Sequence, residues 1–194
     1  YSFRVVNATY VNAYAFPGGS IACTRGILLK LDDEAELAAL LGHEIGHVNA
    51  RHTASAMSKG MLSQAVIGGF SILADSAAPG FGQITSQLGG IGAGALLASY
   101  SRDNERQADA LGTEYMVRAG YGPTGMMGLM DMLRSLSQSK PSGVEIFFST
   151  HPMSDERYQT AVDTVRTQYP HAKDYPVYRE RFMDNAARLR TMQG

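Results

Sequence analysis

One five-residue pattern constrains this 194-residue chain more than any other: His43-Glu44-Ile45-Gly46-His47. On an α-helix, residues four apart project from the same face, so the two imidazoles point to one place and Glu44 lies beside them. Two neutral imidazoles at this spacing suit Zn²⁺, and the adjacent carboxylate can take a proton from a metal-bound water. The pattern H-E-x-x-H therefore predicts a metal site with a base attached.

The pattern also arises by accident, in about one chain of this size in a hundred at background usage of His and Glu. The alternative is then an ordinary helix with two solvated or core histidines. A catalytic zinc needs at least one more protein ligand and an open position, so the rest of the chain decides between the two interpretations.

Composition limits the class of protein. Hydrophobic residues make up 44% of the chain, enough for one domain with a sizeable core, and we expect a single domain over residues 1–194. The formal net charge of -1 and 18% charged residues provide no basic field, which argues against nucleic-acid binding. Cys23 is the only cysteine, which excludes an internal disulfide and a thiolate-rich zinc site.

The N-terminal 30 residues are rich in Val, Tyr, Phe, Ile and Thr, and Phe16-Pro17-Gly18-Gly19-Ser20 interrupts them. This composition predicts strand, tight turn and strand, so a small sheet opens the domain. The segment from Val11 to Phe16 is a candidate edge strand, whose unpaired N–H and C=O groups offer a place for an extended peptide. A plain hairpin that covers the core is the equal alternative.

Helical signals dominate the remainder. Asp33 in the cap position and Glu36 three residues later start a helix that carries the histidine pair to about Arg51 or beyond. Further helices are predicted at about 105–120, 124–137, 155–168 (capped by Ser154) and 177–192. The helix at 124–137 has one apolar face, which we assign to core packing rather than to an adaptable binding surface: Met126, Leu129, Met130, Leu133 and Leu136.

The segment from Met61 to Ser99 contains a single charge, Asp75. Residues 61–73 and 84–99 have helical character and are joined by a Gly/Pro/Ser-rich loop. Each is shorter than the roughly 20 residues that a membrane span needs. We favour a buried or groove-covering helical hairpin, with contact between this segment and a membrane surface as the alternative.

A third ligand does not come from the first helix. The arrangement H-E-x-x-H-x-x-G-x-x-H would place glycine at Ala50 and histidine at Thr53, and neither is present. His52 is one residue short of that place and is interpreted as a surface or second-layer histidine. Glu105 and Asp109, four apart on a later helix, provide a glutamate ligand and a carboxylate that can orient a ligand histidine. Without the H-E-x-x-H helix, Glu105 and Asp109 would be interpreted as part of a solvent-exposed helix face.

Together these motifs resemble a known family. The stretches 43–47, 101–109 and 149–152 with Arg157, preceded by 12–19 and 24–28, are similar to the zinc metallopeptidase family of the CAAX prenyl-protease, HtpX and BepA. The similarity covers most of the chain from Val11 to Arg157, in the family's order.

The resemblance implies an α+β, predominantly α gluzincin-type domain, with a small N-terminal sheet packed on a helical bundle. It implies one Zn²⁺ per chain, bound by His43, His47 and Glu105, with Glu44 as the general base and Asp109 as a second-layer or proton-handling carboxylate. The implied activity is zinc-dependent endoproteolysis of extended or misfolded protein substrates. A zinc-stabilised chaperone or assembly factor with weak or blocked proteolysis is the alternative.

His151 and Arg157 have two readings. In the family the matching residues lie near the metal, where either can stabilise the oxyanion of the reaction. His151 can instead occupy the open zinc position as a fourth ligand and block the activation of water. We expect the loop from Ser142 to Met153 to be mobile and to switch between these roles.

Location follows from the resemblance as well. The absence of long apolar spans departs from the integral membrane members and indicates the exported branch of the bacterial cell envelope, periplasmic or membrane-associated, with a role in protein quality control. The chain begins at Tyr1 without a leader, and we expect that a preceding segment is absent from this sequence. BepA carries a helical-repeat module that is not found here, and the oligomeric state stays open.

Overall fold

The computed structural model of the protein describes residues 1–56, 58 and 100–192. The helices predicted at 61–73 and 84–99 lie outside the described residues, and so do the hairpin and the membrane contact proposed for them. Among the helices of the described part, none has the length and apolar character that a membrane crossing requires.

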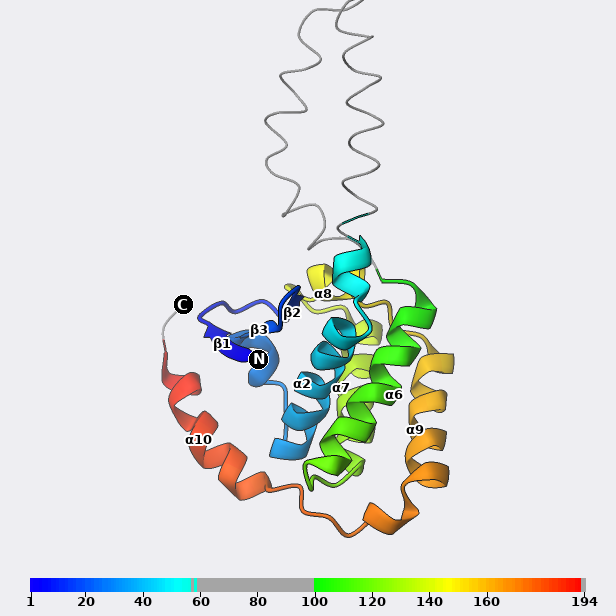
Figure 1. The fold of residues 1–194 in the computed structure, drawn as a ribbon. Helices are drawn as coiled ribbons and strands as arrows, with labels where there is room; N and C mark the ends of the chain where they lie inside the picture. Colours follow the sequence, from blue (N-terminus) through cyan, green and yellow to red (C-terminus); the bar gives the residue numbers. More distant parts are fainter. Residues whose placement is uncertain (57, 59–99, 193–194) are drawn as a thin grey trace, which may run out of the picture.

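A three-stranded sheet opens the chain, as predicted. Its strands are β1 (Ser2–Val6), β2 (Ala13–Phe16) and β3 (Ser20–Thr24), in the order β1-β3-β2 (Figure 1). β2 and β3 are antiparallel, and Gly18 and Gly19 between them have φ angles of 91° and 89°, which glycine adopts without steric cost. β1 pairs with β3 in parallel. β2 is therefore an edge strand, which confirms that part of the prediction.

The other regular elements of the described chain are helices, so the fold is α+β and predominantly α. They are α1 (Arg25–Leu28), α2 (Glu34–Asn49), α6 (Arg102–Arg118), α7 (Thr124–Ser139), α8 (Glu145–Thr150), α9 (Asp155–Gln168), the 3-10 helix η1 (Pro170–Ala172) and α10 (Arg179–Thr191). α2, α6, α7 and α9 pack as a bundle, and the sheet lies beside α2 (Figure 1).

Side-chain caps start the helices that build the site. Asp33 accepts a hydrogen bond from the Glu36 amide at 2.8 Å, and Ser154 accepts one from the Arg157 amide at 3.1 Å, both as predicted. The end of α2 differs from the prediction. The helix stops at Asn49 because Arg51 takes a left-handed φ of 60°, and residues 52–56 then form a new helical turn.

α2 and α6 touch through their backbones. A Cβ atom at Gly42 would lie 2.8 Å from the Gly112 carbonyl oxygen, and one at Gly112 would lie 2.7 Å from the His43 amide nitrogen. One turn further along, a Cβ at Gly46 would lie 3.0 Å from the Ala108 carbonyl oxygen. Small residues at these positions let the two helices approach closely enough for side chains one turn away to meet.

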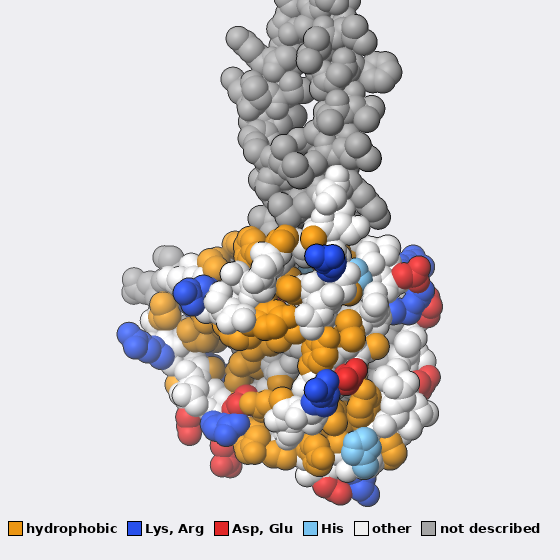
Figure 2. Space-filling view, in the orientation of Figure 1, with side chains coloured by type: hydrophobic (Ala, Val, Ile, Leu, Met, Phe, Trp, Pro, Cys, Tyr) orange, Lys and Arg blue, Asp and Glu red, His pale blue; other side chains and the backbone are white. Residues whose placement is uncertain are grey.

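The apolar face of α7 is core, as predicted: Met126, Leu129, Met130, Leu133 and Leu136 are all buried. On the opposite side of α2 the surface is hollowed. A cavity of about 540 Å³ lies between α2 and α10, lined by apolar side chains that include Leu37, Leu41, Phe182 and Leu189. Figure 2 shows hydrophobic side chains gathered over this face of the molecule.

Candidate metal centre

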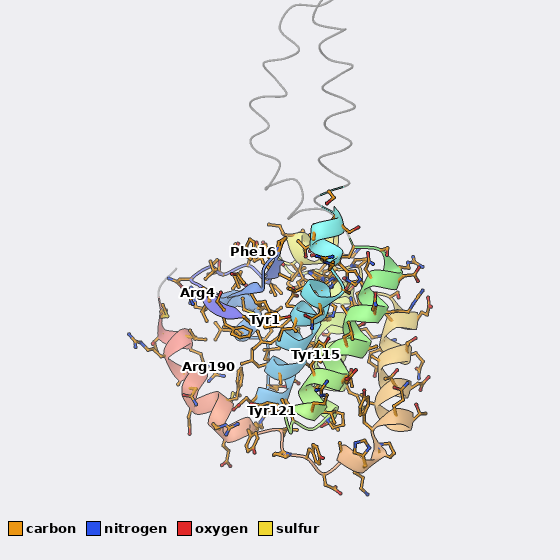
Figure 3. All side chains as sticks on the ribbon, viewed as in Figure 1. Tyr1, Arg4, Phe16, Tyr115, Tyr121 and Arg190 are labelled. Atoms are coloured by element: carbon orange, nitrogen blue, oxygen red, sulfur yellow. The ribbon has the colours of Figure 1, made fainter. Side chains whose placement is uncertain are left out.

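Four buried side chains meet between the C-terminal half of α2 and the start of α6, two helices whose ribbons lie side by side in Figure 3. His43 and His47 come from α2, Glu105 comes from α6, and His151 directly follows α8. One nitrogen or oxygen atom from each lies within 4.8 Å of those of the other three, so the four could hold one metal ion.

The donor atoms have separations close to those of a metal coordination shell. His47 Nε2 lies 3.0 Å from His43 Nε2 and 3.2 Å from Glu105 Oε1. His151 Nδ1 lies 3.3 Å from His43 Nε2 and 3.1 Å from Glu105 Oε1. Ligand atoms bonded to a tetrahedral zinc at about 2.0–2.2 Å are themselves roughly 3.3–3.6 Å apart. Three imidazoles and a carboxylate at these separations fit zinc.

Asp109 fixes the orientation of His43. Its Oδ1 atom lies 2.8 Å from His43 Nδ1, and because a carboxylate only accepts, Nδ1–H donates and Nε2 keeps its lone pair for a metal. Arg157 holds Asp109 with bonds of 2.6 and 2.8 Å from Nε and Nη2, and its Nη1 lies 2.6 Å from Glu105 Oε2. Arg157 thus pairs with both acids of α6.

Glu44 has a different environment. It is fully buried, and neither of its carboxylate oxygens has a hydrogen-bond partner among the described residues. His151 Nε2 approaches Oε1 only to 3.9 Å. Burying an unpaired carboxylate costs several kcal/mol, in the range of about 3–5 kcal/mol for a broken buried pair. A fold that retains such a group next to four donor atoms leaves its oxygens available for a ligand of the site.

Burial sets the charge state of the cluster. It lowers the pKa of His47 to about 4 and also lowers the pKa of His43, so both imidazoles are neutral near pH 7, the form that binds metals. Burial alone would raise the pKa of Glu105, but His151, Arg157 and His43 together hold it well below its usual range. Glu105 is therefore an anion that pairs with Arg157 and lies beside the neutral imidazoles of His43 and His47.

His151 fills the fourth place in the cluster. Its side chain is buried, and its ring stacks on Phe147 with centroids 4.9 Å apart. Burial alone would lower the pKa of His151, but the carboxylates of Glu105 and Glu44 outweigh it and raise that pKa. A cavity of only about 10 Å³ remains between His151 and β2, room for one water at most.

The segment that carries His151 differs from the predicted loop between Ser142 and Met153. Its centre is the helix α8, which buries Phe147 in the core, and the Thr150 carbonyl accepts a hydrogen bond from the Tyr100 amide at 3.0 Å. This helix was not predicted because its six residues are too few to show helical periodicity, and because the burial of Phe147 depends on distant parts of the fold. Whether this segment moves stays a prediction.

His52 lies in a second layer, as interpreted from its spacing. It is buried, and its Nδ1 lies 3.0 Å from Nδ1 of His47. Two further neighbours were not singled out from the sequence. The Tyr100 ring stacks on His47 with centroids 3.9 Å apart, and the Gln107 amide contacts His52. The one local signal for Tyr100 is its place directly before Ser101, the cap of α6.

Thr53 stands where a third histidine would be in the other arrangement, and it has a structural contact instead. Its hydroxyl donates to the Ala15 carbonyl of β2 at 3.1 Å and lies 2.9 Å from the Tyr100 hydroxyl. The edge strand is thereby tied to the helical turn that follows α2, next to the cluster.

One helix carries H-E-x-x-H, a second carries a glutamate with an aspartate one turn later, and a small sheet lies beside the first. This arrangement defines a gluzincin-type metallopeptidase domain. The chain belongs to peptidase family M48, whose family model matches residues 1–165. This assignment confirms the resemblance drawn from the motifs.

Individual relatives agree with it. The chain is 31% identical over 178 residues to the beta-barrel assembly-enhancing protease of Yersinia pestis, covering 88% of this chain and 36% of that protein. It is 30% identical over 164 residues to metalloprotease YcaL of Escherichia coli, covering 84% of this chain and 62% of YcaL. It is 31% identical over 156 residues to the mitochondrial metalloendopeptidase OMA1 of Arabidopsis thaliana, covering 79% of this chain and 29% of OMA1. The chain spans about a third of the beta-barrel assembly-enhancing proteases that it matches.

Proposed function

We propose that this domain is a zinc-dependent endopeptidase in which His43, His47 and Glu105 bind one Zn²⁺. Glu44 carries the proposal, since it is buried without a hydrogen-bond partner beside the donor cluster, and a purely structural zinc would need no such group. Zinc held by these three residues would supply Lewis-acid chemistry for the scissile carbonyl. Glu44 takes a proton from the attacking water and delivers it to the leaving amine.

β2 is the proposed platform for the substrate. A protein or peptide in extended form would add to the edge of the strand between Val11 and Phe16, through main-chain hydrogen bonds. Two main-chain groups there are already engaged within the chain, since Asn12 Oδ1 accepts from the Ala13 amide and the Ala15 carbonyl accepts from Thr53. The contact of Thr53 with Ala15 supports this proposal, because it holds the strand beside the cluster. Main-chain hydrogen bonds tolerate many side chains, which suits extended or misfolded proteins as substrates. The net charge of -1 does not favour binding of nucleic acid.

The Yersinia relative is named for enhancing the assembly of beta-barrels. From the likeness to it we propose a role in protein quality control in the bacterial cell envelope, at a periplasmic or membrane-associated location. A second candidate is a zinc-stabilised chaperone or assembly factor with blocked proteolysis. The specific observation in its favour is His151, whose Nδ1 lies 3.1 Å from Glu105 Oε1 within the donor cluster. A fourth protein ligand there would take the position that a catalytic zinc keeps open.

Metal analysis combined with a peptidase assay tests the proposal. We expect about one zinc per chain, cleavage of an unfolded protein such as casein, loss of cleavage with a chelator, and recovery on addition of zinc. Zinc-loaded protein that binds casein without cleaving it, also after His151→Ala, would favour the chaperone. A chain that binds no zinc would contradict both candidates.

Replacing His151 by Ala is expected to raise peptidase activity severalfold, because it opens the fourth place of the site. Initial rates on casein at saturating zinc measure this, and His171→Ala, an exposed histidine, is the matched control. The zinc content should stay near that of the parent, since three protein ligands remain. Lower activity with zinc still bound would reject the blocking role and favour His151 as a group that stabilises the oxyanion.

A further inference from the structure

Three side chains in series lead from the candidate ligand His47 to the surface of α6. His47 Nδ1 lies 3.0 Å from His52 Nδ1, and His52 Nε2 lies 3.1 Å from Gln107 Oε1. His47 and His52 are buried, whereas Gln107 is on the exposed side of α6. The series therefore joins α2, the turn that follows it, and the second helix of the site.

Hydrogen-bond rules allow only two arrangements of protons along this series. A neutral imidazole donates from one nitrogen and accepts at the other. When the Gln107 carbonyl oxygen accepts from His52 Nε2–H, His52 Nδ1 must accept, and the shared proton belongs to His47 Nδ1. His47 Nε2 then points a lone pair into the cluster. With the amide group of Gln107 reversed, every proton reverses and His47 Nε2 carries a hydrogen, which excludes metal binding.

We infer that His52 and Gln107 are positioning residues for His47, which fix the tautomer and ring orientation that a metal requires. The inference rests on the zinc site of the proposed function. The two histidines of the motif are then oriented from opposite sides by different chemistry. His43 donates a hydrogen bond to the anion Asp109, whereas His47 donates one to the neutral imidazole of His52. The Gln107 amide fixes the tautomer of that imidazole.

The turn at Arg51 is what brings His52 into reach. On an uninterrupted helix, a residue five positions after His47 would project about 140° away from it. Arg51 instead adopts a φ of 60°, a conformation that costs about 1–3 kcal/mol for a residue other than glycine. The chain turns back, and the His52 ring lies edge-on to His47 with centroids 5.0 Å apart and planes at 72°.

Zinc affinity, measured by competition with a chromophoric chelator, tests the inference. His52→Leu is expected to weaken zinc binding by about 10–100-fold, the usual effect of losing a group that orients a ligand. His52→Asn should recover part of the affinity, because its amide oxygen can accept from His47 Nδ1–H. Gln107→Leu should weaken binding less than His52→Leu, and Gln107→Glu should not weaken it, since a carboxylate can only accept. Gln159→Leu, an exposed glutamine of α9, is the matched control.

The melting temperature of each metal-free variant separates positioning from packing. A merely structural role predicts a lower melting temperature for His52→Leu with an unchanged zinc dissociation constant, and that result would overturn the inference. If His52→Leu does not fold, equal zinc affinities for Gln107→Leu and Gln107→Glu would overturn it instead. Failure of the parent protein to bind zinc would contradict the proposed function, which is a different outcome.

Discussion

Replacing Glu44 by Gln is expected to reduce peptide hydrolysis by about 10²–10⁴-fold, the usual contribution of a general base, while zinc binding is retained. Glutamine keeps the shape of the side chain but cannot take up the proton of the attacking water. Glu44 is fully buried without a hydrogen-bond partner in the described chain, so its removal also relieves a buried charge. We therefore expect the metal-free variant to unfold at no lower temperature than the parent.

Three measurements on the same preparation make this result interpretable: kcat on a peptide substrate, zinc per chain, and the melting temperature. Glu180→Gln, an exposed glutamate of α10, is the control and should leave all three unchanged. Turnover retained by Glu44→Gln would contradict the assigned mechanism. Loss of zinc together with activity would instead make Glu44 a ligand or a packing residue.

Replacing Arg157 by Met is expected to destabilise the metal-free protein by about 3–5 kcal/mol, the cost of breaking a buried ion pair by removal of one partner. The guanidinium is buried and pairs with both Asp109 and Glu105, so its loss leaves two buried carboxylates with histidine contacts but without the arginine charge. Urea-induced unfolding of chelator-treated protein measures the change. Arg166→Met, an exposed arginine on the same helix, should change stability by less than about 0.5 kcal/mol.

This comparison also separates the two roles predicted for Arg157. Anchoring predicts that Asp109→Asn added to Arg157→Met recovers part of the lost stability, because one uncompensated charge is removed. A direct role on the oxyanion predicts unchanged stability and zinc content with a lower kcat. The second pattern would show that the observed pairing with the two acids is not the main task of the side chain.

The sequence alone is sufficient for the parts of the site that follow helical spacing. His43 and His47 share a face of α2, and Glu105 and Asp109 share a face of α6, as helical spacing predicts. The contact between the two pairs was expected from the known arrangement of such motifs and not from spacing, because Asp109 lies 66 residues after His43. The edge position of β2 also follows from local turn chemistry. The shared face of each helix and the hairpin of β2 and β3 depend on residues within one or two turns of each other, where periodicity and turn residues determine direction.

The remaining parts depend on contacts between distant segments. Tyr100 stacks on His47 from a position 53 residues later in the chain, and Gln107 reaches His52 from another helix. α8 forms because Phe147 is buried in the core, and six residues show no period of their own. The left-handed Arg51 is an arginine at a position that favours glycine, so propensity predicted a longer helix.

The backbone contact between α2 and α6 has a consequence for how an ion would enter. Gly42 and Gly112 set the distance between the two helices, so the fold itself would place the candidate ligands. The ligand side chains then lose their conformational freedom when the domain folds, before any ion binds. Metal uptake would then be association with a preformed site rather than a folding transition. The ion should exchange without unfolding of the domain, which would allow cobalt to replace zinc as a spectroscopic reporter.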